Sequence, residues 1–204
     1  MPAQTPGRAE PPPPAEPTDA AESRTSARTR RAIVEAAMET WAGDRHATLA
    51  DICGTAGIGR STLHRYYADR AALLAAVSEE CHRQFTTAAV RAHPDDGPGL
   101  EAILRLSEEL LQLGSALSLI FSDNALVDPD TWSDAEESDR GLAGVILRGQ
   151  QDGSIDPDLP ADWVSLTLWM LLAGAWQHGL LGHSRRETVQ LFARSLSGAI
   201  GSRS

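Results

Sequence analysis

The stretch that decides the fold is residues 48–74, which read TLADICGTAGIGRSTLHRYYADRAALL. Thr48 and Asp51 stand three positions apart, the spacing of a reciprocal capping box, so we expect a helix to begin directly after Thr48. The apolar residues that follow recur at intervals of three and four, and Gly57 suits the left-handed conformation that ends many helices. A second short helix is expected over residues 59–67. The pattern therefore predicts two short helices joined by a glycine turn.

The second of these helices has a polar and cationic outer face. Leu63 and Tyr67 lie four positions apart, so both can point into a core. The other side chains can donate hydrogen bonds to phosphates or base edges, and a helix that carries them fits a DNA major groove about 12 Å wide. They are Arg60, Ser61, Thr62, His64, Arg65 and Tyr66. This face favours binding to double-stranded DNA, and a three-helix core with a solvated outer face is the alternative.

The segment resembles the DNA-binding domain of the TetR family of transcriptional regulators. The matching positions are Thr48, Ile52, Cys53, Ala56, Gly57, Ile58, Thr62, Leu63, Tyr67 and Arg70, with Ile33, Ala36, Ala37 and Trp41 upstream. The resemblance covers residues 28–75 and implies a helix-turn-helix domain. Three residues are the best candidates for reading bases, namely Arg60, Ser61 and Thr62. Tyr66 and Arg70 are expected to contact the DNA backbone and so to position the helix on it. Thr48 is a further DNA-binding candidate.

Three positions depart from the usual pattern of the family. Gly59 stands where a serine usually caps the recognition helix, and glycine caps slightly less well. His64 stands where a phosphate-contacting tyrosine is usual, so a contact there would be shorter and sensitive to pH. Arg70 replaces the usual lysine, which keeps the charge and adds a bidentate fork. We therefore expect a functional DNA-binding face with altered contacts at His64.

The net charge of −10 argues against a protein that coats nucleic acid with a general basic surface. The charge is distributed unevenly, because residues 1–70 hold nine arginines and nine acidic residues, whereas residues 71–204 hold nine arginines and nineteen acidic residues. Between Arg24 and Arg70 there are eight arginines and five acidic residues. A mildly basic head on an acidic body would be oriented by the field of the DNA phosphates.

The N-terminal residues 1–25 hold seven of the twelve prolines and no apolar run, so we expect a disordered arm and no signal peptide. The arm is either a solvated tail or a contact to phosphates or the minor groove. A helix-turn-helix domain is expected over residues 26–75 and a helical ligand-binding and dimerisation domain over residues 76–204. Cys53 and Cys81 provide no disulfide framework, which indicates a cytoplasmic protein, and no cofactor or metal site is expected.

The rest of the chain has helical patterns and no convincing strand. Helices are expected over residues 70–92, 99–113, 115–122, 133–151, 161–181 and 185–200. Capping boxes at Ser133 with Glu136 and at Ser184 with Glu187 mark two of the starts. The chain is therefore expected to be all-α, with an N-terminal three-helix head, a helical body, and about nine helices in total.

Residues 163–184 contain no charged side chain, so a membrane span has to be considered. We reject a membrane span because polar residues and glycines dilute the run and no basic flank marks one side. A helix that is apolar nearly all round is more simply buried on two faces, one of them against a partner. The family resemblance implies that the last two helices pair across a two-fold axis. The homodimer would set the two recognition helices about 34 Å apart on a palindromic operator.

The family resemblance also implies that the body binds a small-molecule effector, of unknown identity. Aromatic side chains with a few polar groups suit a mostly apolar ligand. The candidates are Phe121, Trp132, Trp169, Met170, Trp176 and His178. The alternative is that the tryptophans are core or dimer-interface anchors. Asp123, Asn124 and Asp128 could meet a cationic ligand or be solvated loop residues.

The sequence contains no GxSxG elbow, phosphate loop, HExxH helix or paired-cysteine motif, so an enzyme is not expected. The best interpretation is a TetR-like transcriptional regulator that represses by binding a palindromic operator and is released by an effector. A TetR-like activator, or a helical dimeric interaction protein without effector binding, is the alternative.

Overall fold

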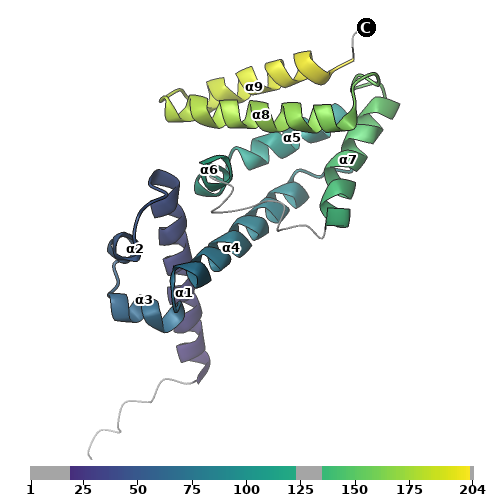
Figure 1. The fold of residues 1–204 in the computed structure, drawn as a ribbon. Helices are drawn as coiled ribbons and strands as arrows, with labels where there is room; N and C mark the ends of the chain where they lie inside the picture. The colour runs from purple at the N-terminus through teal and green to yellow at the C-terminus, as the bar shows by residue number, and fades with distance from the viewer. Residues whose placement is uncertain (1–18, 123–134, 203–204) are drawn as a thin grey trace, which may run out of the picture.

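The computed structural model describes residues 19–122 and 135–202, and these residues form nine α-helices (Figure 1). They are α1 (Asp19–Gly43), α2 (Leu49–Ala56), α3 (Arg60–Tyr66), α4 (Arg70–Arg91), α5 (Gly99–Leu110), α6 (Ser115–Ser122), α7 (Ala135–Gln151), α8 (Ala161–Leu180) and α9 (Arg185–Ile200). Within the described ranges there is no strand, and an isolated bridge joins Ile155 to Gly201. The expected all-α fold is therefore confirmed. The arm up to residue 18 and the expected cap at Ser133 lie outside the described residues.

Local capping signals set the ends of the helices where the sequence predicts them. The Thr48 hydroxyl accepts a hydrogen bond from the Asp51 N–H at 3.3 Å, and the Asp51 carboxylate accepts one from the Thr48 N–H at 2.7 Å. Gly57 adopts a φ of 64° and ends α2, as a left-handed cap requires. Asp69 and Ser184 cap α4 and α9 by accepting a backbone N–H of the first turn.

Two helix boundaries differ from the prediction by more than two residues. α1 begins at Asp19, so residues 19–25, which the composition assigns to a disordered arm, are helical. The last proline of the arm is Pro17, and the residues after it include good helix formers. α5 ends at Leu110 and not at residue 113, because the chain tightens into i→i+3 hydrogen bonds ahead of Gly114, which has a φ of 53°.

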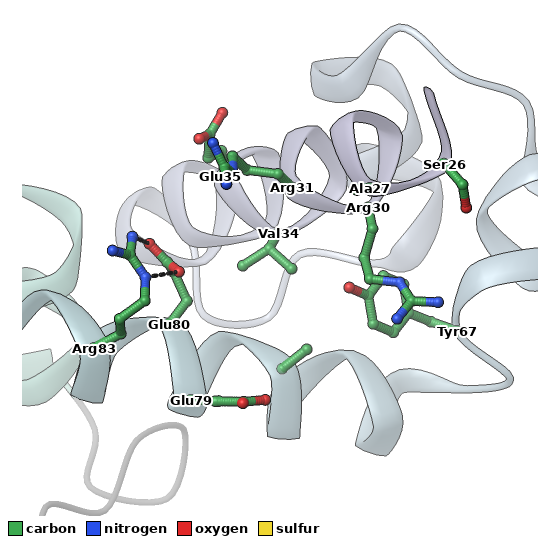
Figure 2. A pocket seen from close by; sticks show the side chains of 11 residues that line it. Ser26, Ala27, Arg30, Arg31, Val34, Glu35, Tyr67, Glu79, Glu80 and Arg83 are labelled. Atoms are coloured by element: carbon green, nitrogen blue, oxygen red, sulfur yellow. Dashed lines mark hydrogen bonds and ion pairs between the residues drawn. The ribbon is translucent and has the colours of Figure 1, made fainter. Parts of the chain in front are cut away.

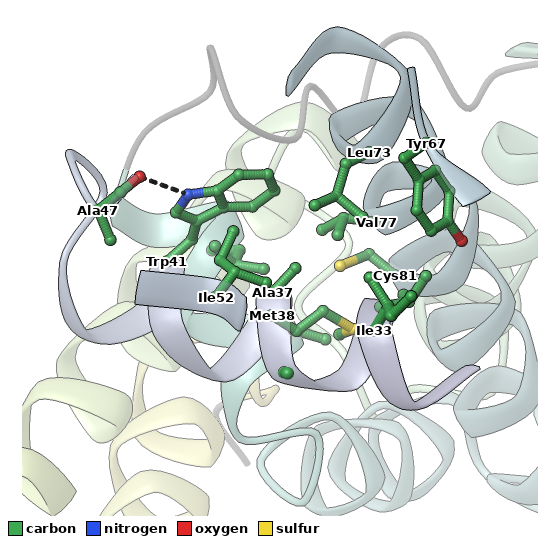
Figure 3. Packing of buried hydrophobic residues seen from close by; sticks show 14 of the residues in the cluster. Ile33, Ala37, Met38, Trp41, Ala47, Ile52, Tyr67, Leu73, Val77 and Cys81 are labelled. Carbon is green, nitrogen blue, oxygen red and sulfur yellow. Dashed lines mark hydrogen bonds between the residues drawn. The ribbon is translucent and has the colours of Figure 1, made fainter. Parts of the chain in front are cut away.

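A first hydrophobic cluster forms the core of the head. Side chains from α1, α2, α3 and the first half of α4 meet in it (Figure 3). Trp41 is 1% exposed, and its ring N–H donates to the Ala47 carbonyl at 3.1 Å. α6 joins the same cluster through Leu119, and the Ser118 hydroxyl donates to the Ala42 carbonyl of α1 at 3.3 Å. The head is therefore packed directly against a helix that the sequence assigns to the body.

A second hydrophobic cluster forms the core of the body, with side chains from the second half of α4 and from α5, α7, α8 and α9. α4 contributes to both clusters, so it links the head to the body as predicted (Figure 1). Cys53 and Cys81 are both buried free thiols. Burial raises the pKa of Cys81 to about 12, which keeps this thiol protonated and unreactive.

Two arginines hold the turn that follows α4. Arg105 of α5 donates to the carbonyls of Ala92 and His93, each at 3.0 Å. Arg148 of α7 donates to the carbonyl of Pro94 in the same turn. The end of the linking helix is thereby fixed to two helices of the body.

α8 is apolar on two opposite faces, as the sequence predicts. One face buries Val164, Leu168 and Leu172 in the body. On the other face Trp163 is 55% exposed and Met170 is 59% exposed. Among the helices that the structure describes, none combines the length and the hydropathy that a membrane crossing needs.

Candidate nucleic-acid interface and effector site

α3 presents the polar face that the sequence predicts. Leu63 is buried in the head core, and Tyr67, directly after the helix, is 7% exposed. The other side chains of α3 are exposed or half buried at the surface of the head. The exposed ones are Arg60, Ser61, His64 and Arg65, and the half-buried ones are Thr62 and Tyr66. One face of a single short helix therefore offers hydroxyl, imidazole and guanidinium donors together.

An open groove of about 300 Å³ lies between α2 and α3. Thr48, Arg60 and His64 line it, so three of the predicted DNA-binding residues are brought together from two helices. The rest of the lining is Leu49, Ala50, Cys53 and Leu63. The polar groups at this groove are positioned by the packing of α2 on α3.

Thr48 also has a structural role at the start of α2. Its hydroxyl donates to the Asp51 carboxylate at 2.7 Å. Hydrogen bonds from the side chain and the backbone of Thr48 lower the pKa of Asp51. Because an ionised carboxylate at a helix N-terminus also interacts favourably with the helix dipole, Asp51 stabilises the start of α2. The hydroxyl of Thr48 is therefore engaged within the head, while its side chain stays exposed.

Tyr66 connects α3 to the N-terminal part of α1. Hydrogen bonding with the hydroxyls of Ser26 and Thr29 lowers the pKa of Tyr66, and Arg65 lowers it further. The Arg65 guanidinium lies 5.2 Å from the centroid of the Tyr66 ring, within the range of a cation–π contact. His64 Nδ1 lies 3.2 Å from the backbone carbonyl four residues later. These contacts fix the C-terminal half of α3 on the head.

Arg70 is directed into the head. Its guanidinium donates to the Ala47 carbonyl at 2.6 Å and to the Arg45 carbonyl at 2.9 Å. It also lies 4.6 Å from the centroid of the Trp41 ring. The sequence assigns Arg70 to the DNA backbone, whereas in the structure its donors hold the loop between α1 and α2. The bidentate fork that distinguishes arginine from lysine is used here on two protein carbonyls.

Aromatic side chains from three helices meet between the head and the body. The ring centroids of Phe121 and Trp169 are 6.4 Å apart, and those of Phe121 and Trp176 are 6.1 Å apart. Phe85 of α4 stacks on Trp169 with centroids 6.4 Å apart. All four rings are half buried, so part of each is open to solvent. We call Phe85, Phe121, Trp169 and Trp176 the aromatic cluster.

A curated bacterial regulator is similar to the chain over most of its length, although no family model matches. The HTH-type transcriptional repressor LfrR of Mycolicibacterium smegmatis is 33% identical over 174 residues, which are 85% of this chain and 90% of that protein. LfrR is described as a TetR-like transcriptional regulator. The chain belongs to the TetR family of transcriptional regulators.

Solved structures of TetR-family proteins agree with this assignment. The crystal structure of LfrR in complex with proflavine is 30% identical, has a TM-score of 0.70, and matches 89% of this chain and 99% of LfrR. A TetR-family regulator from Marinobacter aquaeolei VT8 has a TM-score of 0.69 over 89% of this chain and 99% of its own. Its identity is 22%, so this second likeness concerns the fold alone.

In this TetR-family protein, two of the predicted effector contacts, Met170 and His178, do not lie with the aromatic cluster. Met170 is exposed on the outer face of α8, because one step along a helix turns the side chain by about 100°. His178 Nδ1 lies 2.8 Å from the Thr188 hydroxyl, and the ring stacks on His183, with centroids 3.8 Å apart. Trp132 lies outside the described residues.

Phe85 is the member of the aromatic cluster that the sequence did not predict. It belongs to the helical pattern of α4, where a single phenylalanine gives no periodic signal of its own. Its partners are Phe121 of α6 and Trp169 of α8, far away in the sequence, so only the packing of the helices brings them together. Trp169 and Trp176 lie seven positions apart, so helical spacing alone places both on one face of α8.

Proposed function

We propose that this TetR-family regulator is a repressor that binds a palindromic DNA operator as a homodimer and is released when an effector binds in its body. The observation that carries the proposal is the exposed face of α3, where hydroxyl and guanidinium donors stand beside each other on a rigid head. LfrR, which is named as a transcriptional repressor, supports the choice of repression. Activation, and a dimeric interaction protein without an effector, are the alternatives. The protein would act in the cytoplasm.

Within this proposal the residues of α3 have different roles. Arg60, Ser61 and Thr62 occupy its first turn, which would enter the major groove and read base edges. Arg65 and Tyr66 at its end, with His64 in the groove beside α2, would contact phosphates. Thr48 and Arg70 would act chiefly by holding α2 and the loop before it in place, which their hydrogen bonds support.

The outer faces of α8 and α9 support the proposed homodimer. Trp163, Leu166 and Met170 follow each other at helical spacing on α8 and are each at least half exposed. Leu191 of α9 and Leu181 after α8 add exposed apolar area. Several large apolar side chains exposed on one helix pair favour an interaction site. A second copy of the same face would bury it about a two-fold axis.

The aromatic cluster is the proposed effector site. LfrR has been crystallised with proflavine, a planar aromatic cation, and half-buried aromatic rings suit such a ligand through stacking and cation–π contact. α6 carries Phe121 in this site and also packs on α1 through Leu119, so a ligand that moves α6 would move the head.

The proposal is tested by fluorescence anisotropy with the DNA that flanks the protein's own gene. Specific binding should weaken steeply as salt rises, because phosphate contacts release counterions. Arg60→Ala should cost about 1–3 kcal/mol of binding free energy, since it removes a base or phosphate contact from an exposed position. If the salt response were flat or Arg60→Ala bound specific DNA like the native chain, the recognition face would be wrongly assigned.

The effector site is tested on the same complex with proflavine as the probe. Proflavine should release the DNA from the native protein, and Trp169→Leu should raise the concentration needed for release without weakening DNA binding. Leu147→Ala is the control, because it changes an exposed apolar residue of α7 that lies outside both the aromatic cluster and the proposed dimer face. Equal release from both variants would place the effector elsewhere.

A further inference from the structure

A second groove, distinct from the aromatic cluster, lies between α1 and α4 on the head and has a volume of about 500 Å³ (Figure 2). Both helices contribute side chains to its lining, which contains apolar residues as well as charged groups. The apolar residues are Ala27, Val34 and Ala76, and the polar ones are Ser26, Arg30, Arg31, Glu35, Tyr67, Glu79, Glu80 and Arg83. The groove therefore pairs an apolar surface with charges of both signs.

The Tyr67 hydroxyl is buried in this groove without a hydrogen-bond partner among the described residues. The residue is 7% exposed, and Figure 2 shows its hydroxyl between α1 and α4. Burial raises the pKa of Tyr67, so the hydroxyl stays protonated and neutral at physiological pH. Buried polar groups are nearly always hydrogen-bonded, so an unpartnered donor aimed into an open groove indicates a ligand that accepts its hydrogen bond.

Some of the charges in the groove are already paired. Arg83 donates to both carboxylate oxygens of Glu80, at 2.5 and 2.8 Å, and Gln84 donates to Glu80 at 2.9 Å. The charge of Arg31 also acts on Glu80 and lowers its pKa. The negative charge of Glu80 is therefore compensated and offers little to a ligand.

Two opposite charges remain close to the Tyr67 hydroxyl. Arg30 lowers and Glu79 raises the pKa of Tyr67, so both act on this group through space. Arg30 comes from α1 and lies beside Tyr67 in Figure 2, whereas Glu79 comes from α4 and faces the same groove. Neither side chain forms an ion pair with another described residue, and both are exposed. A guanidinium, a hydroxyl donor and a carboxylate thus line one groove.

We propose that this groove binds a small zwitterion, an α-amino acid with an apolar side chain. Its carboxylate would accept hydrogen bonds from Arg30 and Tyr67, its ammonium would pair with Glu79, and its side chain would cover Val34 and Ala76. A simple anion would face the uncompensated Glu79, and a simple cation would face Arg30, so neither matches both charges. The ligand would bridge α1 and α4 and is separate from the effector of the aromatic cluster.

The binding test is a titration of the full chain with L-leucine, followed by the amide NMR signals of Ala27, Val34 and Ala76. These signals should shift saturably. Isocaproate lacks the ammonium group and isoamylamine lacks the carboxylate, so each should bind about tenfold more weakly because one charge-assisted hydrogen bond is lost. Absence of saturable shifts at the groove, or equal binding of either analogue, would overturn the proposal.

Variants locate the site without depending on DNA binding. Tyr67→Phe keeps the ring in the head core and removes only the hydroxyl, so leucine should bind about tenfold more weakly while the unfolding midpoint is unchanged or higher. Arg30→Gln should weaken leucine binding similarly, whereas Arg28→Gln, an exposed arginine of α1 outside the groove, should not. Unchanged leucine binding by both Tyr67→Phe and Arg30→Gln would refute the site even if the repressor proposal held.

Discussion

At the scale of single residues, Arg70 shows how a side chain of the recognition segment serves the fold. Its guanidinium donates to the carbonyls of Ala47 and Arg45 and lies on Trp41, so Arg70→Ala removes a hydrogen bond from each carbonyl and the cation–π contact. We expect a loss of about 1–3 kcal/mol in the free energy of unfolding, measured by urea denaturation. Arg60→Ala is the control, because this exposed arginine should change stability little and DNA affinity strongly. Equal unfolding midpoints for the two variants would contradict the structural role of Arg70.

Also at this scale, the Thr48 and Asp51 pair predicts a pH dependence. The hydrogen bonds from Thr48 lower the pKa of Asp51 in the folded state below 3.8, its ordinary value. A carboxyl group with a lowered folded pKa contributes stability above its unfolded pKa and loses it as the pH falls through the folded pKa. Thr48→Ala removes this cap and should therefore lower the stability near neutral pH, and the difference should shrink in acid well below pH 3.8. Thermal melts of both proteins across this range measure the effect, and a constant difference would speak against it.

At the scale of helices, the crossing of α5 over α7 depends on two glycines. A Cβ built on Gly99 would lie 2.4 Å from the Cα and N of Gly149, which are backbone atoms that cannot move aside independently. Gly99→Ala should therefore destabilise the body by about 1–3 kcal/mol or more through overpacking. The variant would also disturb the start of α5, where the Gly99 N–H donates to the Asp152 carboxylate at 2.9 Å.

The matched control is Gly144→Ala, because Gly144 lies on α7, as Gly149 does. A Cβ there meets no atom within 4 Å, so this variant should be neutral or stabilise the helix by about 0.5–1 kcal/mol. Urea unfolding of the two variants would compare them directly. A small effect of Gly99→Ala would mean that the two helices can separate at little cost.

At the scale of the whole molecule, the exposed apolar face of α8 and α9 predicts the oligomeric state. Native protein should sediment at twice the mass of one chain, and Leu166→Glu should sediment as a monomer because it places a charge on the apolar face. Leu147→Glu changes an equally exposed leucine of α7 and should leave the dimer intact. Since two heads are needed for two half-sites, the monomeric variant should also lose tight operator binding. A Leu166→Glu dimer would require another interface.

The sequence by itself determined the elements that depend on local physics. Thr48, Gly57 and Asp69 act within one turn of their own position, so capping and turn chemistry were enough to place α2, α3 and the start of α4. Helical spacing likewise identified Leu63 and Tyr67 as inward-facing, and the two apolar faces of α8. The family resemblance rests on these same local patterns.

Only the tertiary structure decided the contacts between distant segments. Phe85 reaches Trp169, Arg70 reaches Arg45, and Gly99 meets Gly149, because independent helices pack at angles that no local spacing encodes. The same packing left the Tyr67 hydroxyl in a groove between α1 and α4, although its spacing with Leu63 showed only that it points inward. Local hydrogen bonds and periodicity thus fix which side of a helix faces the core, whereas the partner on that side is set by how the helices cross.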